Sequence, residues 1–71
     1  MSRADLIDMS GVVTEVNAGG NFIVKTEKLA VLARLAGRLR RFKIRVVMGD
    51  RVTVSVSPYD PTRGFITYRQ G

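Results

Sequence analysis

Apolar and polar residues alternate along much of this chain, with the period of two that is typical of half-buried β-strands. The alternation is clearest in residues 51–57, RVTVSVS, where the valines fall on one face and Thr and Ser on the other. Residues 22–27, FIVKTE, show the same alternation. Residues 6–16 and 65–70 are rich in the β-branched and aromatic residues that strands prefer. The pattern therefore predicts short strands over most of the chain.

Turn-forming residues separate these strands. Residues 17–21, NAGGN, and 48–50, MGD, are short and contain glycine, and residues 58–64, PYDPTRG, are predicted to be a loop because they hold two prolines and a glycine. Gly11 instead lies inside the first strand. A glycine in mid-strand often marks the bend at which a sheet curls into a barrel, so we expect a small barrel.

The middle of the chain decides which barrel is expected. Residues 30–36, AVLARLA, fit a strand or a helix, and residues 37–42 fit one or two turns of helix. One helix over residues 30–45 is the alternative, but Gly37 and the nearby β-branched residues oppose it. A short helix between the third and fourth of five strands is the OB-fold arrangement. We therefore expect an all-β fold, a five-stranded OB-fold barrel with one short helix between strands 3 and 4, as a single domain over residues 1–71.

Positive charge is abundant and concentrated. The chain has 12 basic and 6 acidic residues, for a formal net charge of +6. Half of the basic residues fall in residues 34–45, where no acidic residue dilutes them: Arg34, Arg38, Arg40, Arg41, Lys43 and Arg45. Nine of the 12 are arginine, whose planar group suits phosphate. The pattern favours nucleic acid as the partner, and a membrane-active or protein-docking basic helix is the alternative.

Several classes of function find no support. Cysteine and histidine are absent, which excludes disulfides and thiolate or imidazole metal sites. The carboxylates are scattered and no phosphate-binding or dinucleotide motif is present, so we expect neither an enzyme nor a cofactor. No apolar run approaches the roughly 20 residues of a membrane span, and the N-terminus lacks the apolar segment of a signal peptide. The expectation is a cytoplasmic monomer.

The five aromatic residues are divided between core and surface. Phe22 and one of Phe65 or Tyr68 are expected in the core. Tyr59 lies in the polar loop, where it either stacks on RNA or fixes the loop through its hydroxyl. The aromatic patterns of RRM and cold-shock domains are absent.

Residues 48–69, MGDRVTVSVSPYDPTRGFITYR, resemble the bacterial translation initiation factor 1 family, which carries a Gly-Asp-Lys/Arg-Val-Thr-Val strand followed by Ser/Thr-Pro-Tyr-Asp and Arg/Lys-Gly. The segment AGRLRR, residues 36–41, and Ile44-Arg45 extend the similarity. The resemblance implies an RNA-binding barrel that occupies the decoding (A) site of the small ribosomal subunit. There it would block tRNA, assist the other initiation factors, and touch rRNA and a neighbouring ribosomal protein. The mechanism implied is occupancy, without chemistry.

The resemblance also implies which residues make contact. The RNA-binding set is Arg38, Arg40, Arg41, Lys43, Arg45, Tyr59 and Arg63, and the loop Ala18, Gly19, Gly20 corresponds to a tip that inserts into an RNA groove. One departure from the family lies at TEKLA, residues 26–30, which lacks the usual Asn-Gly turn, so this hairpin must close differently. The alternative function is a general single-strand nucleic-acid binder, an RNA chaperone of cold-shock type.

Overall fold

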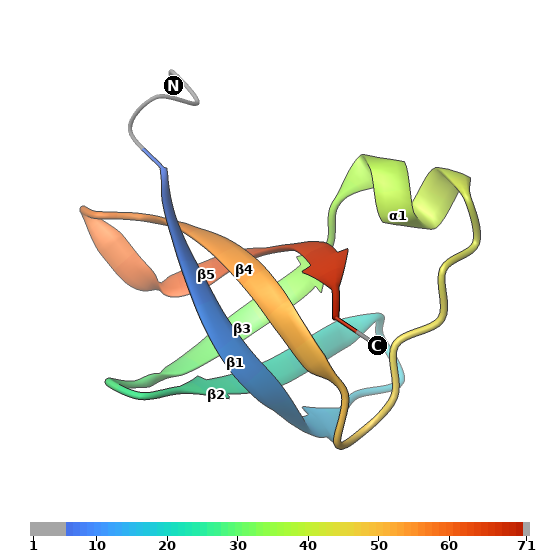
Figure 1. Ribbon diagram of the computed structural model, residues 1–71, viewed down its shortest axis with the longest axis horizontal. Coiled ribbons are helices and arrows are strands. Elements are labelled where there is room, and N and C mark those ends of the chain that lie inside the picture. The colour runs from blue at the N-terminus through green and yellow to red at the C-terminus, as the bar shows by residue number, and fades with distance from the viewer. Residues whose placement is uncertain (1–5, 71) are drawn as a thin grey trace.

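The strands close into a five-stranded barrel with one short helix outside it (Figure 1). The computed structural model describes residues 6–70. In chain order the elements are β1 (Ile7–Val16), β2 (Asn21–Thr26), β3 (Ala30–Leu35), α1 (Gly37–Arg41), β4 (Arg51–Ser57) and β5 (Asp60–Arg69). The strands are arranged in the order β1-β2-β3-β5-β4, with β3 and β5 parallel and the other pairs antiparallel. The predicted barrel and the position of its helix are confirmed.

The barrel interior is filled mainly by β-branched side chains from alternate strand positions. In β4 the three valines face inward, as their spacing predicted. The buried apolar side chains are Val13, Phe22, Val24, Val31, Ala33, Leu39, Val46, Val52, Val54, Val56 and Ile66. Small branched residues suit this narrow interior because they fill it without rotamer strain.

β1 closes the barrel, since it pairs with β2 on one edge and with β4 on the other. Gly11 lies opposite Thr26 on one side and Val52 on the other. A Cβ atom at Gly11 would lie 2.7 Å from Val24 Cγ1 and 2.8 Å from the Lys25 carbonyl oxygen. The glycine thus permits a close approach between β1 and β2 where the sheet curves.

The prediction of a loop over residues 58–64 is wrong. Only Pro58 and Tyr59 form the turn, and β5 begins at Asp60, which pairs with Ser57. The Tyr59 N–H donates to Ser57 Oγ at 3.1 Å and tightens the turn. Pro61 is tolerated because it lies near the start of the strand, where a missing N–H donor costs little.

The prediction that Phe65 or Tyr68 is in the core is also wrong. Their exposed fractions are 53% and 57%, whereas Phe22 is buried as expected. Ile66 occupies the inward position of β5. FITY is apolar on both faces, so its sequence alone does not set the phase of the strand.

The hairpin between β2 and β3 is closed by a side chain in place of an Asn-Gly turn. Thr26 Oγ1 donates to the Leu29 carbonyl at 2.8 Å and accepts the N–H groups of Lys28 and Leu29. Because a threonine hydroxyl can both donate and accept, this one buried side chain makes three of the hydrogen bonds of the turn, and the Thr26 N–H adds a backbone bond to the Leu29 carbonyl at 2.9 Å.

Candidate nucleic-acid interface

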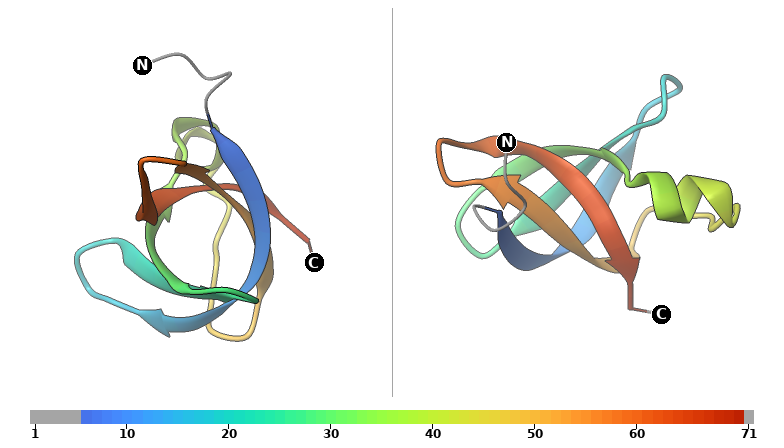
Figure 2. Two further views of the ribbon diagram at one scale, coloured as in Figure 1. Left: turned by 90° about the vertical axis from the view of Figure 1, so that its left-hand side faces the viewer. Right: turned by 90° about the horizontal axis from the view of Figure 1, so that it is seen from above.

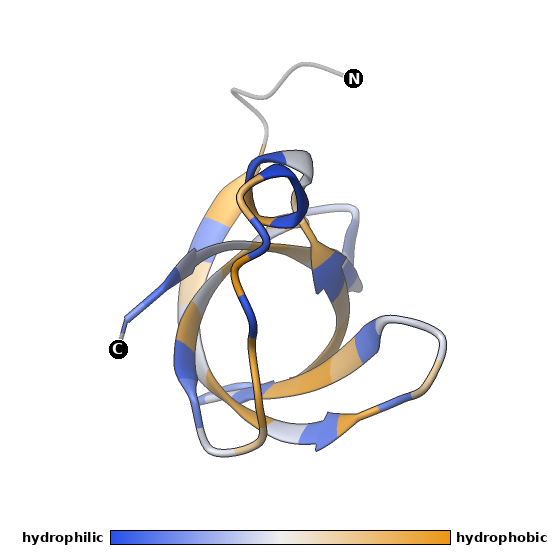
Figure 3. Cartoon of the chain, turned by 90° about the vertical axis from the view of Figure 1, so that its right-hand side faces the viewer, coloured by the Kyte–Doolittle hydropathy of each residue, from blue (hydrophilic) through white to orange (hydrophobic). Residues whose placement is uncertain are grey.

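The basic segment lies across one end of the barrel. α1 follows β3 directly, and the Ala36 N–H donates to the Ile66 carbonyl at 2.9 Å, which fixes the start of the helix to β5. Leu39 is the buried residue of the helix. Residues 42–50 then cross the barrel mouth to β4 (Figure 3). One apolar anchor is thus enough to turn the arginines of this short helix toward solvent.

α1 ends in a Schellman motif. The Lys43 N–H donates to the Arg40 carbonyl and the Ile44 N–H to the Leu39 carbonyl, at 3.1 and 2.9 Å. Ile44 and Leu39 both pack on the core, which supplies the apolar contact common in this motif. Lys43 has φ 55°, the left-handed region that usually selects glycine. A lysine therefore occupies a strained position and presents a charge there.

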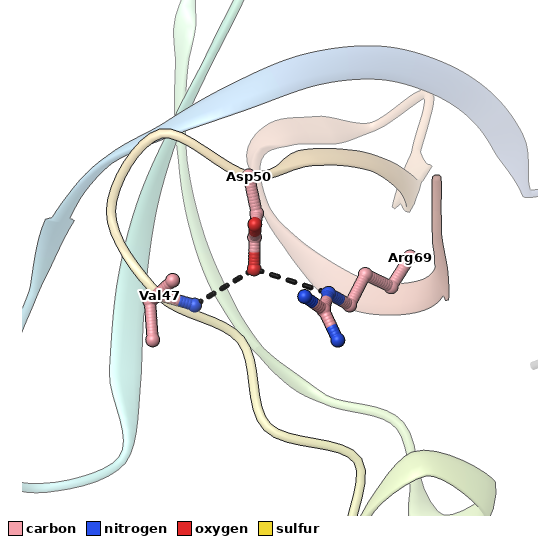
Figure 4. A network of polar contacts seen from close by, with 3 residues as sticks. All are labelled: Val47, Asp50 and Arg69. Carbon is pink, nitrogen blue, oxygen red and sulfur yellow. Dashed lines mark hydrogen bonds and ion pairs between the residues drawn. The ribbon is translucent and has the colours of Figure 1, made fainter. Parts of the chain in front are cut away.

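Asp50 holds the far end of the crossing segment. Its Oδ2 accepts the Val47 N–H at 3.0 Å and pairs with Arg69 Nε at 3.2 Å (Figure 4). The Asp50 carbonyl accepts the Val13 N–H at 2.9 Å, which ties the same turn to β1. Val46 is buried within the barrel mouth. The segment that carries Arg45 is therefore anchored on both sides of that residue.

We name five exposed basic residues of this end the cationic cap: Arg38, Arg40, Arg41, Lys43 and Arg45. Within residues 6–70 the single ion pair is Arg69 with Asp50, so none of the five is neutralised by a carboxylate there. Five like charges on a short anchored segment repel one another and favour a polyanion. The basic stretch thus presents a concentrated patch of positive charge that is suited to an anionic partner.

Replacing Lys43 with glycine is expected to raise stability while weakening anion binding. Relief of the left-handed strain, about 1–2 kcal/mol, exceeds the entropic cost of glycine, about 0.5–1 kcal/mol. The net gain of about 0.5–1 kcal/mol should raise the melting temperature by roughly 2–8 °C. Lys43→Ala is the control, because it removes the charge but keeps the strain. If both variants melt at the same temperature, the backbone at Lys43 is not strained.

The loop Ala18, Gly19, Gly20 lies at the same end of the barrel as α1 and projects to one side of it (Figure 2). Its base is closed by the Asn17 N–H to the Asn21 carbonyl at 2.8 Å. All three residues are exposed. The structure thus brings this loop near the cap, in a position to reach the same partner.

The remaining residues of the predicted set lie elsewhere. Tyr59 is 86% exposed. The turn between β4 and β5, to which it belongs, lies at the opposite end of the barrel from α1 (Figure 2). The Tyr59 backbone N–H donates to Ser57 Oγ and holds the turn, while its side chain is largely exposed to solvent. Arg63 lies on the flank, opposite Leu32 of β3. The predicted residues therefore form one dense group at the cap and two outlying contacts.

A shallow groove on the flank is a feature that the sequence did not reveal. It consists of two adjoining hollows that share Leu6, Ser55 and Phe65. Arg34 and Arg63 line one hollow and Arg38 the other. We call these six residues the β5 groove. The sequence showed the positive charge of Arg34. It did not show which residues lie beside Arg34, because these are set by the parallel pairing of β3 with β5.

Other kinds of site are not indicated by the part of the chain that the structure describes. No three acidic residues gather there in a way that could hold a metal ion. None of the helical structure in residues 6–70 is long and apolar enough to cross a membrane. The cationic cap and the β5 groove are the surfaces to be explained.

Comparison with models of known protein families gives no match. Individual relatives are clear: the chain is 53% identical over 70 residues to translation initiation factor IF-1 of Solibacter usitatus, covering 97% of each chain. It is 47% identical to that of Oenococcus oeni over the same share of both chains. A solution structure of the same initiation factor from the Wolbachia endosymbiont of Brugia malayi superposes with a TM-score of 0.80 at 32% identity, over 99% of this chain and 84% of that one. The chain therefore belongs to the translation initiation factor IF-1 family.

Proposed function

We propose that this protein binds the decoding (A) site of the small ribosomal subunit during initiation, blocks premature binding of tRNA there and assists the other initiation factors. Its contacts would be with rRNA and with a neighbouring ribosomal protein. The observation that carries the proposal is the cationic cap, five exposed basic side chains without carboxylate partners in residues 6–70, on a chain of this family. The mechanism is occupancy of a site, and the family is not one of enzymes.

The cap is suited to phosphate groups. Arginine offers a rigid fork of donors that matches phosphate oxygens, and such contacts fix a protein's position on RNA without reading sequence. Anchoring by Leu39, Val46 and Asp50 holds the cap in shape before binding, which lowers the entropic cost of association. A basic surface that is ordered before binding is therefore suited to RNA that is itself folded before binding.

The distribution of the candidate residues favours folded RNA. The helix that carries much of the cap and the β4–β5 turn that carries Tyr59 lie at opposite ends of a molecule that measures 27 × 26 × 23 Å. Arg63 lies on β5, where it pairs with Leu32 of β3. A partner that touches all three must surround much of the protein. A structured subunit meets that requirement better than a short flexible strand.

A general single-strand RNA binder is the second candidate. The exposed rings of Phe65, Tyr68 and Phe42 beside arginines favour it, because such proteins stack bases on aromatic side chains in a basic groove. The two functions differ in selectivity. The initiation factor should prefer the folded subunit, whereas the general binder should take any unpaired strand.

Labelled protein should bind purified small subunits tightly in the presence of excess unstructured RNA. The reason is that phosphates arranged on a folded surface engage both ends of the protein together, whereas a loose strand must be ordered to do so. Equilibrium titration with and without competitor measures the difference. If ordinary RNA displaces the protein from the subunit at comparable concentration, the second candidate is correct and site-specific occupancy is not.

A further inference from the structure

Phe65 stands at the centre of the β5 groove, since it lines both of its hollows. Half of its surface is exposed, while the neighbouring Ile66 fills the core. The barrel therefore does not need an aromatic ring at this position for packing. Such a ring on a strand face is a surface on which a planar group can stack.

Three arginines stand around this ring. Arg34 lies directly opposite Phe65 in the parallel pairing of β3 with β5, and Arg63 lies two residues earlier on β5. Arg38 lines the other hollow at the start of α1. None of them is in an ion pair within residues 6–70. An apolar platform with cations on both sides selects a partner that is planar and also anionic.

The hollow that holds Arg38 is polar on its other wall. Asp8, Thr53, Ser55 and Thr67 line it, and Ser55 Oγ donates to Asp8 Oδ1. A carboxylate only accepts hydrogen bonds, so Asp8 repels phosphate and favours an amino group of a base or a ribose hydroxyl. Charge thus assigns the phosphates to the arginines and the base edge or sugar to this wall.

We propose that the β5 groove binds one unpaired RNA nucleotide, whose base stacks on Phe65 while Arg34 and Arg63 on one side and Arg38 on the other hold the flanking phosphates. Every base has a face that can stack, so the site requires an unpaired base more than a particular one. The cationic cap contacts RNA backbone; this groove takes a base. The inference rests on the proposed function only in that small-subunit RNA would supply the nucleotide.

The test uses the whole protein and a short single-stranded adenylate oligonucleotide that carries the fluorescent base 2-aminopurine. Loss of the ring in Phe65→Leu should weaken binding by about tenfold and abolish quenching of the probe, because stacking supplies that part of the affinity. Phe65→Tyr keeps a ring and should bind within about twofold of the native protein. Thermal melting checks that both variants are folded.

Two further measurements keep the result independent of any single variant. Ring protons of Phe65 in the native protein should shift on addition of the oligonucleotide but not on addition of its duplex. An oligoglutamate peptide, which carries charge without bases, should compete poorly. Equal binding by Phe65→Leu and Phe65→Tyr, unshifted ring protons, or equal competition by the peptide would each overturn the proposal.

Binding to small subunits is measured separately with the same variants. Stacking without subunit binding would mean that the proposed function fails and the groove stands. If Phe65→Leu binds subunits as the native protein does and the ring protons do not shift, the proposed function stands and the groove does not bind a base.

Discussion

Replacing Arg38, Arg40, Arg41 and Arg45 together with alanine is expected to weaken binding to small ribosomal subunits by at least about a hundredfold, because charge-assisted contacts contribute about 1.5–3 kcal/mol each and are not fully additive. These side chains are exposed and in no ion pair within residues 6–70, so little of the fold depends on them. The melting temperature should therefore stay within a few degrees of the native value, or rise as repulsion is relieved. Anisotropy titration and thermal melting measure the two effects.

The salt dependence of binding gives a second reading of the same prediction. If the five residues of the cap each neutralise a phosphate, the log–log slope of affinity against salt should be roughly −3.5 to −4.5. The quadruple variant loses four of these contacts, so its slope should be less steep by roughly 3 to 3.5. A slope near zero for the native protein would contradict an electrostatic interface.

Single variants separate binding from folding. Arg40→Ala, Arg41→Ala and Arg45→Ala should each reduce affinity by about tenfold or more without changing the melting temperature. Lys28→Ala is the matched control, because Lys28 is an exposed basic residue in the β2–β3 hairpin. That hairpin lies at the end of the barrel away from α1 (Figure 1). If an arginine variant melts far below the native protein, that residue is structural.

The barrel could be predicted because its strongest signals are local. The valines of β4 specify one inward face, and polar residues occupy the other. The helix was placed to within one residue, since Gly37 begins it and the β-branched residues after Lys43 do not continue it. β5 was the exception: Pro58 and Pro61 suggested a long loop, although only the first lies in the turn.

Of the two candidate surfaces, one could be predicted from the sequence and the other could not. The cap is a continuous stretch of sequence, so its charge was visible before its structure. The β5 groove joins residues from β3, β4 and β5 with the start of α1, and it exists only because Arg34 is in register with Phe65, 31 positions further along. Sequence pattern sets neither that register nor the outward phase of Phe65, since both depend on how β5 pairs with β3 and with β4.

Replacing Gly64 with alanine is expected to give the largest loss of stability. A Cβ atom there would collide with the Ser55 carbonyl oxygen and would lie 2.6 Å from Val56 Cγ1. The first contact is with backbone, which cannot rotate away, so β5 must move from β4. We expect a cost of about 3 kcal/mol or more, which in a domain of this size lowers the melting temperature by roughly 12–25 °C.

The same substitution should also disturb the β5 groove, since Gly64 lies between Arg63 and Phe65 on one strand. Gly37→Ala is the matched control: the added methyl group meets nothing within 4 Å, and alanine favours the helix that begins there. That variant should melt at or slightly above the native temperature. A native-like melting temperature for Gly64→Ala would show that the β4–β5 spacing can relax. In that case the barrel would not fix the shape of the groove, and the groove would take the shape that fits a base only when the base binds.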